Sequence, residues 1–149
     1  DLNTANTSIL PIAGEVWADA AGIAERARTL GNVELVNRYV SDQEAAEYFA
    51  RADAVLLPYR SVTGSGVLAM ARHYRRPVIA SDLPALRREI DADRLGWTFP
   101  TGDAAALAQL LRTAITRQQA VEISAAMPSD PVASGWDKMA RAIAGIRSN

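Results

Sequence analysis

The sequence contains no cysteine and a single histidine, His73, among its 149 residues. The absence of cysteine excludes disulfides, thiolate metal ligands and a cysteine nucleophile, and it favours a reducing compartment such as the cytoplasm. A single histidine also excludes most metal-binding constellations and every mechanism that needs several histidines. No Ser-His-Asp or paired-carboxylate arrangement can be assembled, so the sequence identifies no catalytic residue and indicates no metal site.

Long apolar runs and an excess of either charge are lacking as well. No apolar stretch approaches the roughly 18 residues of a membrane span, and no signal peptide is visible. The formal net charge is −1, so the sequence does not favour bulk attraction to nucleic acid or to an acidic membrane surface. With 49% hydrophobic and 22% charged residues, the chain has the composition and length of one globular domain.

Short apolar runs alternate with helix-like segments along the chain. The runs predict strands at residues 8–14, 33–36, 54–57, 77–80 and 96–100. Helices are predicted at residues 17–30, 69–74, 83–90, 103–115, 118–126 and about 135–147, with a further helix opened by the capping box Ser41-x-x-Glu44. This alternation predicts right-handed βα units and therefore an α/β fold: a Rossmann-like open, mostly parallel sheet with helices on both faces.

Residues 58–68 follow the third predicted strand, precede a helix, and contain Gly64, Ser65 and Gly66. The first N–H groups of a helix have no internal partner, and the helix dipole places partial positive charge there. Glycine lets a phosphate approach the backbone, and Ser65 can cap the helix. The pattern is compatible with a phosphate-binding loop, but a Gly-Ser-Gly loop is more often an ordinary strand-to-helix turn.

Three loops leave the carboxyl ends of predicted strands, at residues 37–40, 59–66 and 81–86. Ligands of open α/β sheets bind beyond these ends, so we expect the loops to form one crevice. Arg60 and Arg38 are either phosphate-binding cations or solvated loop side chains. Tyr39 and Tyr59 either stack on a base or sugar or pack against the protein.

Four basic side chains follow the glycine loop along its predicted helix. They are Arg72, His73, Arg75 and Arg76. The arginines are interpreted as a solvated face near a helix C-terminus, where cations are favoured. His73 is interpreted as an exposed helical residue rather than an acid or base.

A series of short motifs runs through nearly the whole chain in a fixed order. In chain order, the motifs are Ile12-Ala13-Gly14-Glu15, Asn32-Val33-Glu34-Leu35, residues 52–58, Ser65-Gly66-Val67-Leu68, residues 76–82, residues 96–108 and Gly135-Trp136. The series resembles the C-terminal, donor-binding half of GT-B glycosyltransferases. The similar enzymes are those of the large retaining family, family 4 or group 1, that includes sucrose- and mannosyl-transferring enzymes.

The resemblance implies that the chain is one half of a GT-B fold, that it binds a nucleoside diphosphate sugar, and that it needs no metal or other cofactor. The residues that it places at the donor's pyrophosphate are Thr63, Gly64, Ser65, Gly66, Val67 and Arg60. The residues that it places at the nucleotide base are Arg38, Tyr39 and Val40. The residues that it places beside the donor sugar are Ser81 and Asp82.

The sequence departs from this family in three respects that matter for the site. One is that Arg87-Arg88-Glu89 follows Asp82 where one acidic residue is commoner. Thr63 and Ala71 stand where the family has two glutamates, the second of which binds the ribose hydroxyls. The sequence thereby resembles a subgroup with a Ser-Gly-Val signature in place of the acidic pair. The cationic Gly-Arg…Lys-Gly segment of the family is absent too. We therefore expect residues 1–149 to be a single donor-binding domain that lacks the first βα unit and the N-terminal acceptor domain.

Three functions are compatible with this sequence. The first is the donor half of a hexosyltransferase, cytoplasmic or peripheral to the inner face of the membrane, inactive without the domain that holds the acceptor. The second is half of a nucleotide-sugar epimerase, an enzyme that usually needs more ionisable site residues. The third is a non-catalytic Rossmann-like regulatory or interaction domain, an alternative that the missing glutamates and the missing cationic segment leave open.

Overall fold

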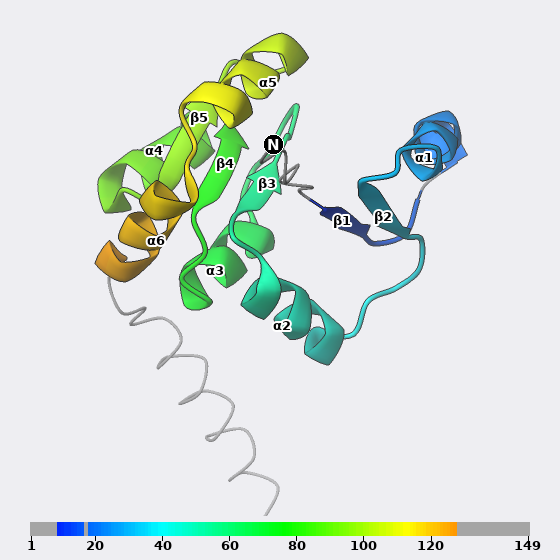
Figure 1. Cartoon of the computed structure of the whole chain (residues 1–149), viewed down its shortest axis with the longest axis horizontal. Coiled ribbons are helices and arrows are strands. Elements are labelled where there is room, and N and C mark those ends of the chain that lie inside the picture. Colours follow the sequence, from blue (N-terminus) through cyan, green and yellow to red (C-terminus); the bar gives the residue numbers. More distant parts are fainter. Residues whose placement is uncertain (1–8, 17, 128–149) are drawn as a thin grey trace, which may run out of the picture. The chain divides into compact units, whose positions relative to one another are not determined.

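The computed structural model describes residues 9–16 and 18–127. The predicted helix at 135–147 and the Gly135-Trp136 motif lie outside the described residues. The chain divides into two compact units, Asp1–Tyr48 (unit 1) and Phe49–Asn149 (unit 2). Each unit has its own parallel sheet with helices beside it (Figure 1). The predicted α/β class with parallel strands is therefore confirmed.

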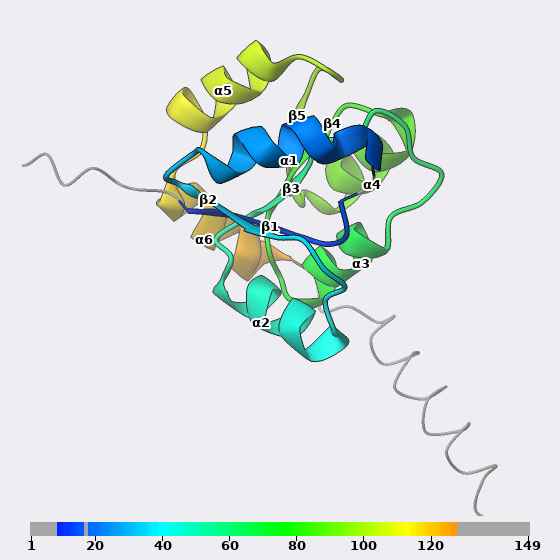
Figure 2. The same cartoon turned by 90° about the vertical axis from the view of Figure 1, so that its right-hand side faces the viewer.

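The sheet of unit 1 consists of β1 (Leu10–Ala13) and β2 (Val33–Val36). The two strands pair in parallel, with Leu10 opposite Val33 and Ala13 opposite Val36. They are connected through a short 3-10 turn, η1 (Ala18–Ala20), and α1 (Ala21–Arg28). Helix α1 packs against β2 (Figure 2). This βαβ arrangement brings the carboxyl ends of β1 and β2 to the same edge.

The sheet of unit 2 contains β3 (Val55–Leu57), β4 (Val78–Ser81) and β5 (Gly96–Phe99) in that spatial order. Helix α4 (Pro84–Asp93) packs against β4 and β5, and α5 (Ala104–Thr113) packs against β5. All four residues of β4 are buried, as expected for a parallel strand covered on both faces. Among the described residues, the largest fully buried side chains are Leu57, Leu68, Leu86, Ile90, Leu95 and Met127.

Side-chain caps set the starts of several helices. In α2 (Asp42–Arg51), the Glu44 N–H donates to Ser41 Oγ at 3.3 Å and the Ser41 N–H donates to Glu44 Oε2 at 3.0 Å, which confirms the predicted capping box. Asp103 Oδ1 caps α5 by accepting the Ala106 N–H at 2.8 Å. Helix α3 (Gly66–His73) begins three residues before its predicted start at residue 69, because Ser65 caps it.

The interpretation of the arginines at the end of α3 as a solvated face was incomplete, because each of them bonds to another element. Arg72 pairs with the last residue of α4 at 2.8 Å. Arg76 donates to the carbonyl of Ala50 near the end of α2 at 2.7 Å. Arg75 donates to the carbonyl of Met127 after α6 (Arg117–Ala126) at 2.7 Å. Carbonyl groups at helix C-termini attract cations, which explains the bonds of Arg75 and Arg76. Together, the three arginines connect the end of α3 to the elements around it.

None of the helices in residues 9–16 and 18–127 is both long and apolar enough to cross a lipid bilayer. His73, the last residue of α3, is exposed as predicted.

Candidate functional site

The loop between β3 and α3 presents the amino end of a helix to solvent. Ser65 occupies two of the first N–H groups: its Oγ accepts from Leu68 at 3.1 Å and its carbonyl accepts from Ala69 at 3.2 Å. Within the described part of the chain, no hydrogen bond occupies the N–H groups of Gly66 and Val67. Both residues are exposed. These two donors are therefore open to an anion that approaches from outside the protein.

Gly64 and Gly66 are not required by the packing of the protein itself. A Cβ atom built on either residue would meet no atom within 4 Å. Neither residue has a positive φ, so the backbone at these positions is accessible to any amino acid. What the two glycines do provide is an unobstructed approach to the backbone from the solvent side.

The other predicted residues of this loop differ in how they are placed. Arg60 is exposed, and none of the ion pairs among the described residues involves it. Tyr59 packs against the hydrophobic core of unit 2, which confirms the packing alternative for this side chain. Ala71 is completely buried in the same core, so this position of α3 contributes to packing and not to ribose recognition.

Ser81 and Asp82 stand at the carboxyl end of β4. The Ser81 side chain is completely buried, and its Oγ has no hydrogen-bond partner among the described residues. Asp82 Oδ1 accepts from both Oγ1 and N–H of Thr101 at 2.9 Å. These bonds, with that from the hydroxyl first, lower the pKa of the Asp82 carboxyl. Asp82 therefore ties the end of β4 to the loop that follows β5.

A Ser81→Ala substitution tests whether the buried hydroxyl contributes to stability. We expect the free energy of unfolding to stay the same or to rise, because a buried hydroxyl without a partner costs about 1–3 kcal/mol. Thr101→Val is the matched control, since it removes a hydroxyl that is bonded to Asp82 and should cost about 1 kcal/mol. Urea denaturation of both variants measures this, and a larger loss for Ser81→Ala than for Thr101→Val would contradict the expectation.

A hollow of about 530 Å³ lies at the carboxyl ends of β1 and β2 in unit 1. The residues that line it are Glu15, Val16, Asn37, Arg38 and Tyr39. The Val16 N–H donates to Asn37 Oδ1 at 2.7 Å, so this bond joins the loops that follow the two strands. Sequence analysis predicted Arg38 and Tyr39 as ligand contacts and placed Asn37 in the same crevice loop, but it assigned no role to Glu15 or Val16. These residues could have been found from the predicted topology, because parallel strands place the loops that follow them side by side.

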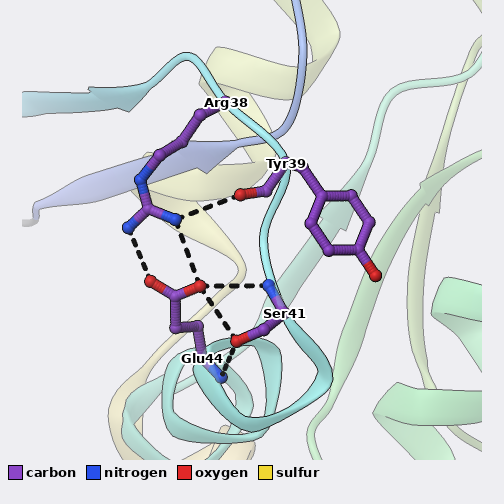
Figure 3. Close-up of polar contacts among 4 residues, drawn as sticks. All are labelled: Arg38, Tyr39, Ser41 and Glu44. Atoms are coloured by element: carbon purple, nitrogen blue, oxygen red, sulfur yellow. Dashed lines mark hydrogen bonds and ion pairs between the residues drawn. The ribbon is translucent and has the colours of Figure 1, made fainter.

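Arg38 is held in place by Glu44 at the start of α2 (Figure 3). Its Nη2 lies 2.5 Å from Glu44 Oε1, and its Nη1 donates to Glu44 Oε2 at 3.1 Å and to the carbonyl of Tyr39 at 3.0 Å. The Tyr39 ring points away from this pair and is 72% exposed (Figure 3). Arg38 thus fixes the loop, while Tyr39 offers a free aromatic face.

The Arg38–Glu44 pair predicts a pH dependence. Hydrogen bonds from Arg38 and then from Ser41 lower the pKa of Glu44 from 4.5 to about 2, and Glu44 in turn raises the pKa of Arg38. A carboxyl whose pKa is depressed by folding stabilises the fold above its unfolded pKa, and that contribution is lost as the pH falls toward the folded value. We therefore expect acid to release Glu44 between about pH 4.5 and 2.

NMR of the Glu44 carboxyl carbon against pH measures this directly. A midpoint near 2 is expected, and an ordinary midpoint near 4.5 would contradict the pair. In the Glu44→Gln variant, the corresponding acid-induced change in the amides of Arg38 and Ser41 should disappear.

The predicted base contacts Arg38, Tyr39 and Val40 lie in unit 1, whereas the predicted pyrophosphate and sugar contacts lie in unit 2. Within the two described ranges, no group of three or more His, Cys, Asp or Glu side chains is arranged to hold a metal ion.

A family model described as glycosyl transferases group 1 matches residues 4–117 of the chain. The chain belongs to this family. The matched range includes both the α3 loop and the hollow of unit 1, so all of the predicted contact residues fall inside it. The predicted family is confirmed, while its Ser-Gly-Val subgroup stays a prediction.

This group 1 chain is also similar to a curated protein of Mycobacterium leprae (strain TN), phosphatidyl-myo-inositol mannosyltransferase. The two sequences are 34% identical over 116 residues. The aligned part covers 74% of this chain but only 29% of that protein. The chain therefore corresponds to less than a third of the curated relative that it matches.

Proposed function

We propose that this chain is the donor-binding part of a group 1 glycosyltransferase, and that its α3 loop binds the pyrophosphate of a nucleoside diphosphate sugar. The observation that carries the proposal is the exposed amino end of α3, where two glycines serve no packing need and two N–H groups are open. Family membership supplies the chemical class of the ligand. It also disfavours the non-catalytic alternative.

The chemistry of transfer explains why such a loop is useful. As the glycosidic bond breaks, the departing nucleoside diphosphate gains negative charge. The N–H groups of Gly66 and Val67 and the positive end of the helix dipole would stabilise that charge in place. The guanidinium of Arg60, six residues before the first residue of α3, would add a charge-assisted hydrogen bond. These groups position and stabilise the leaving group, and they transfer no proton.

We further propose that the acceptor is bound by a part of the full-length protein outside this chain, and that transfer proceeds with retention. The coverage of 29% of the mannosyltransferase supports a larger whole, and the name of that relative supports a hexosyl donor.

The proposal is tested on the full-length protein with a panel of nucleotide sugars. We expect it to release a nucleoside diphosphate from one of them and to pass the sugar to an acceptor. An epimerase would instead convert the nucleotide sugar into an isomer without releasing the diphosphate. A regulatory domain would do neither, and product analysis by NMR separates the three outcomes.

A further inference from the structure

A second, smaller hollow of about 90 Å³ lies in unit 2, at the amino ends of β3 and β4. It is bordered by Asp53 just before β3, by Arg76 and Pro77 just before β4, and by one face of α6. The residues that α6 contributes are Arg117, Ala120, Val121 and Ser124. The α3 loop follows the carboxyl end of β3, so this hollow lies at the opposite end of the sheet from the proposed donor site.

Arg76 carries a positive charge that no acidic group of the described residues balances. Its Nη2 donates to the carbonyl of Ala50 at 2.7 Å, and its Nε is buried without a hydrogen-bond partner in the described ranges. None of the ion pairs found in those ranges includes this partly buried side chain. Burying a charge is costly unless an opposite charge compensates it, so the hollow beside Arg76 favours an anion.

Arg117 brings a second positive charge to a position where a cation is unfavourable. It is the first residue of α6, and the helix dipole places partial positive charge at that end. Its Nε lies 3.9 Å from Asp53 Oδ1, and the two side chains are 87% and 79% exposed. So long and exposed an ion pair contributes little, which leaves the Arg117 guanidinium available to a ligand. Two arginines and one aspartate give the lining of the hollow a net charge of +1.

The size of the hollow limits the ligand. A volume of about 90 Å³ corresponds to roughly three water molecules. It therefore admits a phosphate-sized oxyanion and excludes a whole nucleotide, since pockets for ligands of that size measure about 300 Å³ or more. Ser124 already donates its hydroxyl proton to the carbonyl of Arg75 at 2.6 Å, so the donors left for a ligand are the two guanidinium groups. Guanidinium groups bind phosphate oxygens through charge-assisted hydrogen bonds.

We propose that this hollow binds a phosphate group between Arg76 and Arg117, at a site separate from that of the donor. The phosphate group is either free inorganic phosphate or part of a small phosphorylated metabolite whose remainder stays in solvent. Asp53 weakens this binding, because its carboxylate competes with the phosphate for Arg117. The bound phosphate connects the amino end of α6 to the segment that enters β4. The inference goes beyond the proposed function, because it involves neither the nucleotide nor the α3 loop.

The test is an amide NMR titration of the isotopically labelled 149-residue chain with inorganic phosphate and, separately, with glucose 6-phosphate. Sodium chloride at matched ionic strength is the reference titration. We expect saturable shifts at Arg117, Gln118 and Val121 with at least one of the two phosphates. Similar affinities would show that the phosphate group alone is recognised, whereas a tighter response to one of them assigns the source. The absence of shifts with both phosphates, or equal shifts with chloride, would overturn the site.

Three variants assign the binding to named side chains. Arg117→Gln should weaken phosphate about tenfold or more, the effect of losing hydrogen bonds between charged groups. Asp53→Asn should strengthen phosphate about threefold, because it removes the competing carboxylate. Arg112→Gln is the matched control, since Arg112 is an exposed arginine of α5 that does not line the hollow.

Equal weakening by Arg112→Gln and Arg117→Gln would show that only the overall charge matters, and it would overturn the site. Weaker binding in Asp53→Asn would overturn the competing role of Asp53. The amides of residues 64–67 report the donor site separately from those of α6. Failure of the phosphate site is therefore distinguishable from failure of the proposed function.

Discussion

The Gly96→Ala variant is expected to lose about 3 kcal/mol or more of the free energy of unfolding of unit 2. A Cβ at this position would lie 1.9 Å from the carbonyl oxygen of Val78 and 2.7 Å from its nitrogen. Gly96 also has a φ of +154°, a conformation that side-chain-bearing residues rarely adopt. The clash and the backbone strain would both disturb the pairing of β4 with β5, in which Val78 lies opposite Gly96.

The backbone of Val78 cannot move aside without breaking the sheet. Its N–H donates to the carbonyl of Leu95 at 2.8 Å, and it belongs to the fully buried strand β4. Urea denaturation followed by circular dichroism measures the loss. Gly22→Ala in α1 is the matched control, because a Cβ there meets no atom within 4 Å and alanine favours a helix by up to about 1 kcal/mol. Equal midpoints for Gly96→Ala and the wild type would contradict the described pairing of β4 with β5.

The Gly66→Val variant is expected to lose affinity for nucleoside diphosphates without losing stability. A Cβ at residue 66 meets no atom within 4 Å, and valine is tolerated in a helix at least as well as glycine, so the unfolding midpoint should not fall. Its branched side chain would stand where a phosphate must approach the N–H groups of residues 66 and 67. We expect the affinity for nucleoside diphosphates to fall about tenfold or more, the effect of losing a hydrogen bond to a charged group.

Gly22→Val serves as the control for this second variant, because Gly22 has the same open surroundings but lies in α1 of unit 1. It should leave the affinity unchanged. Unchanged diphosphate affinity in Gly66→Val would show that the amino end of α3 is not the phosphate site. The two glycine variants therefore distinguish Gly96, which the packing of the sheet requires, from Gly66, whose proposed role is in ligand binding.

Local chemistry explains how much of the fold could be predicted from the sequence. Strand β2 was predicted with the bounds that the structure has, and β3, β4 and β5 to within one residue, because each is a short apolar run between turn residues. Ser41 and Asp103 cap helices as their spacing indicated. The capping box of α6, Thr116 with Gln119, was missed although its Thr-x-x-Gln spacing was visible, so that helix begins one residue earlier than predicted.

Contacts between segments distant in the sequence could not be predicted. The bond from Arg76 to Ala50 depends on where α2 ends beside α3, and the bonds from Thr101 to Asp82 depend on the adjacency of β4 and β5. No local pattern encodes such adjacency. For this reason, the arginines at the end of α3 were interpreted from the sequence as solvated. For the same reason, no partner for Asp82 was predicted in the loop after β5.

The candidate site shows the same division. Gly64, Ser65 and Gly66 were identified because a capped helix after a strand has a recognisable local pattern. The pair of Arg38 with Glu44 and the exposed Glu15 beside Asn37 follow instead from the conformation of two loops.

The central claim is that the amino end of α3 binds a nucleoside diphosphate, and a titration of the isotopically labelled chain tests it most directly. Amide NMR shifts are followed while GDP, UDP, ADP and TDP are added separately to millimolar concentration. We predict saturable shifts for one diphosphate that are largest at Gly64, Ser65, Gly66 and Val67, and their loss in Gly66→Val. Shifts that leave these four amides unchanged, for every diphosphate, would contradict the claim.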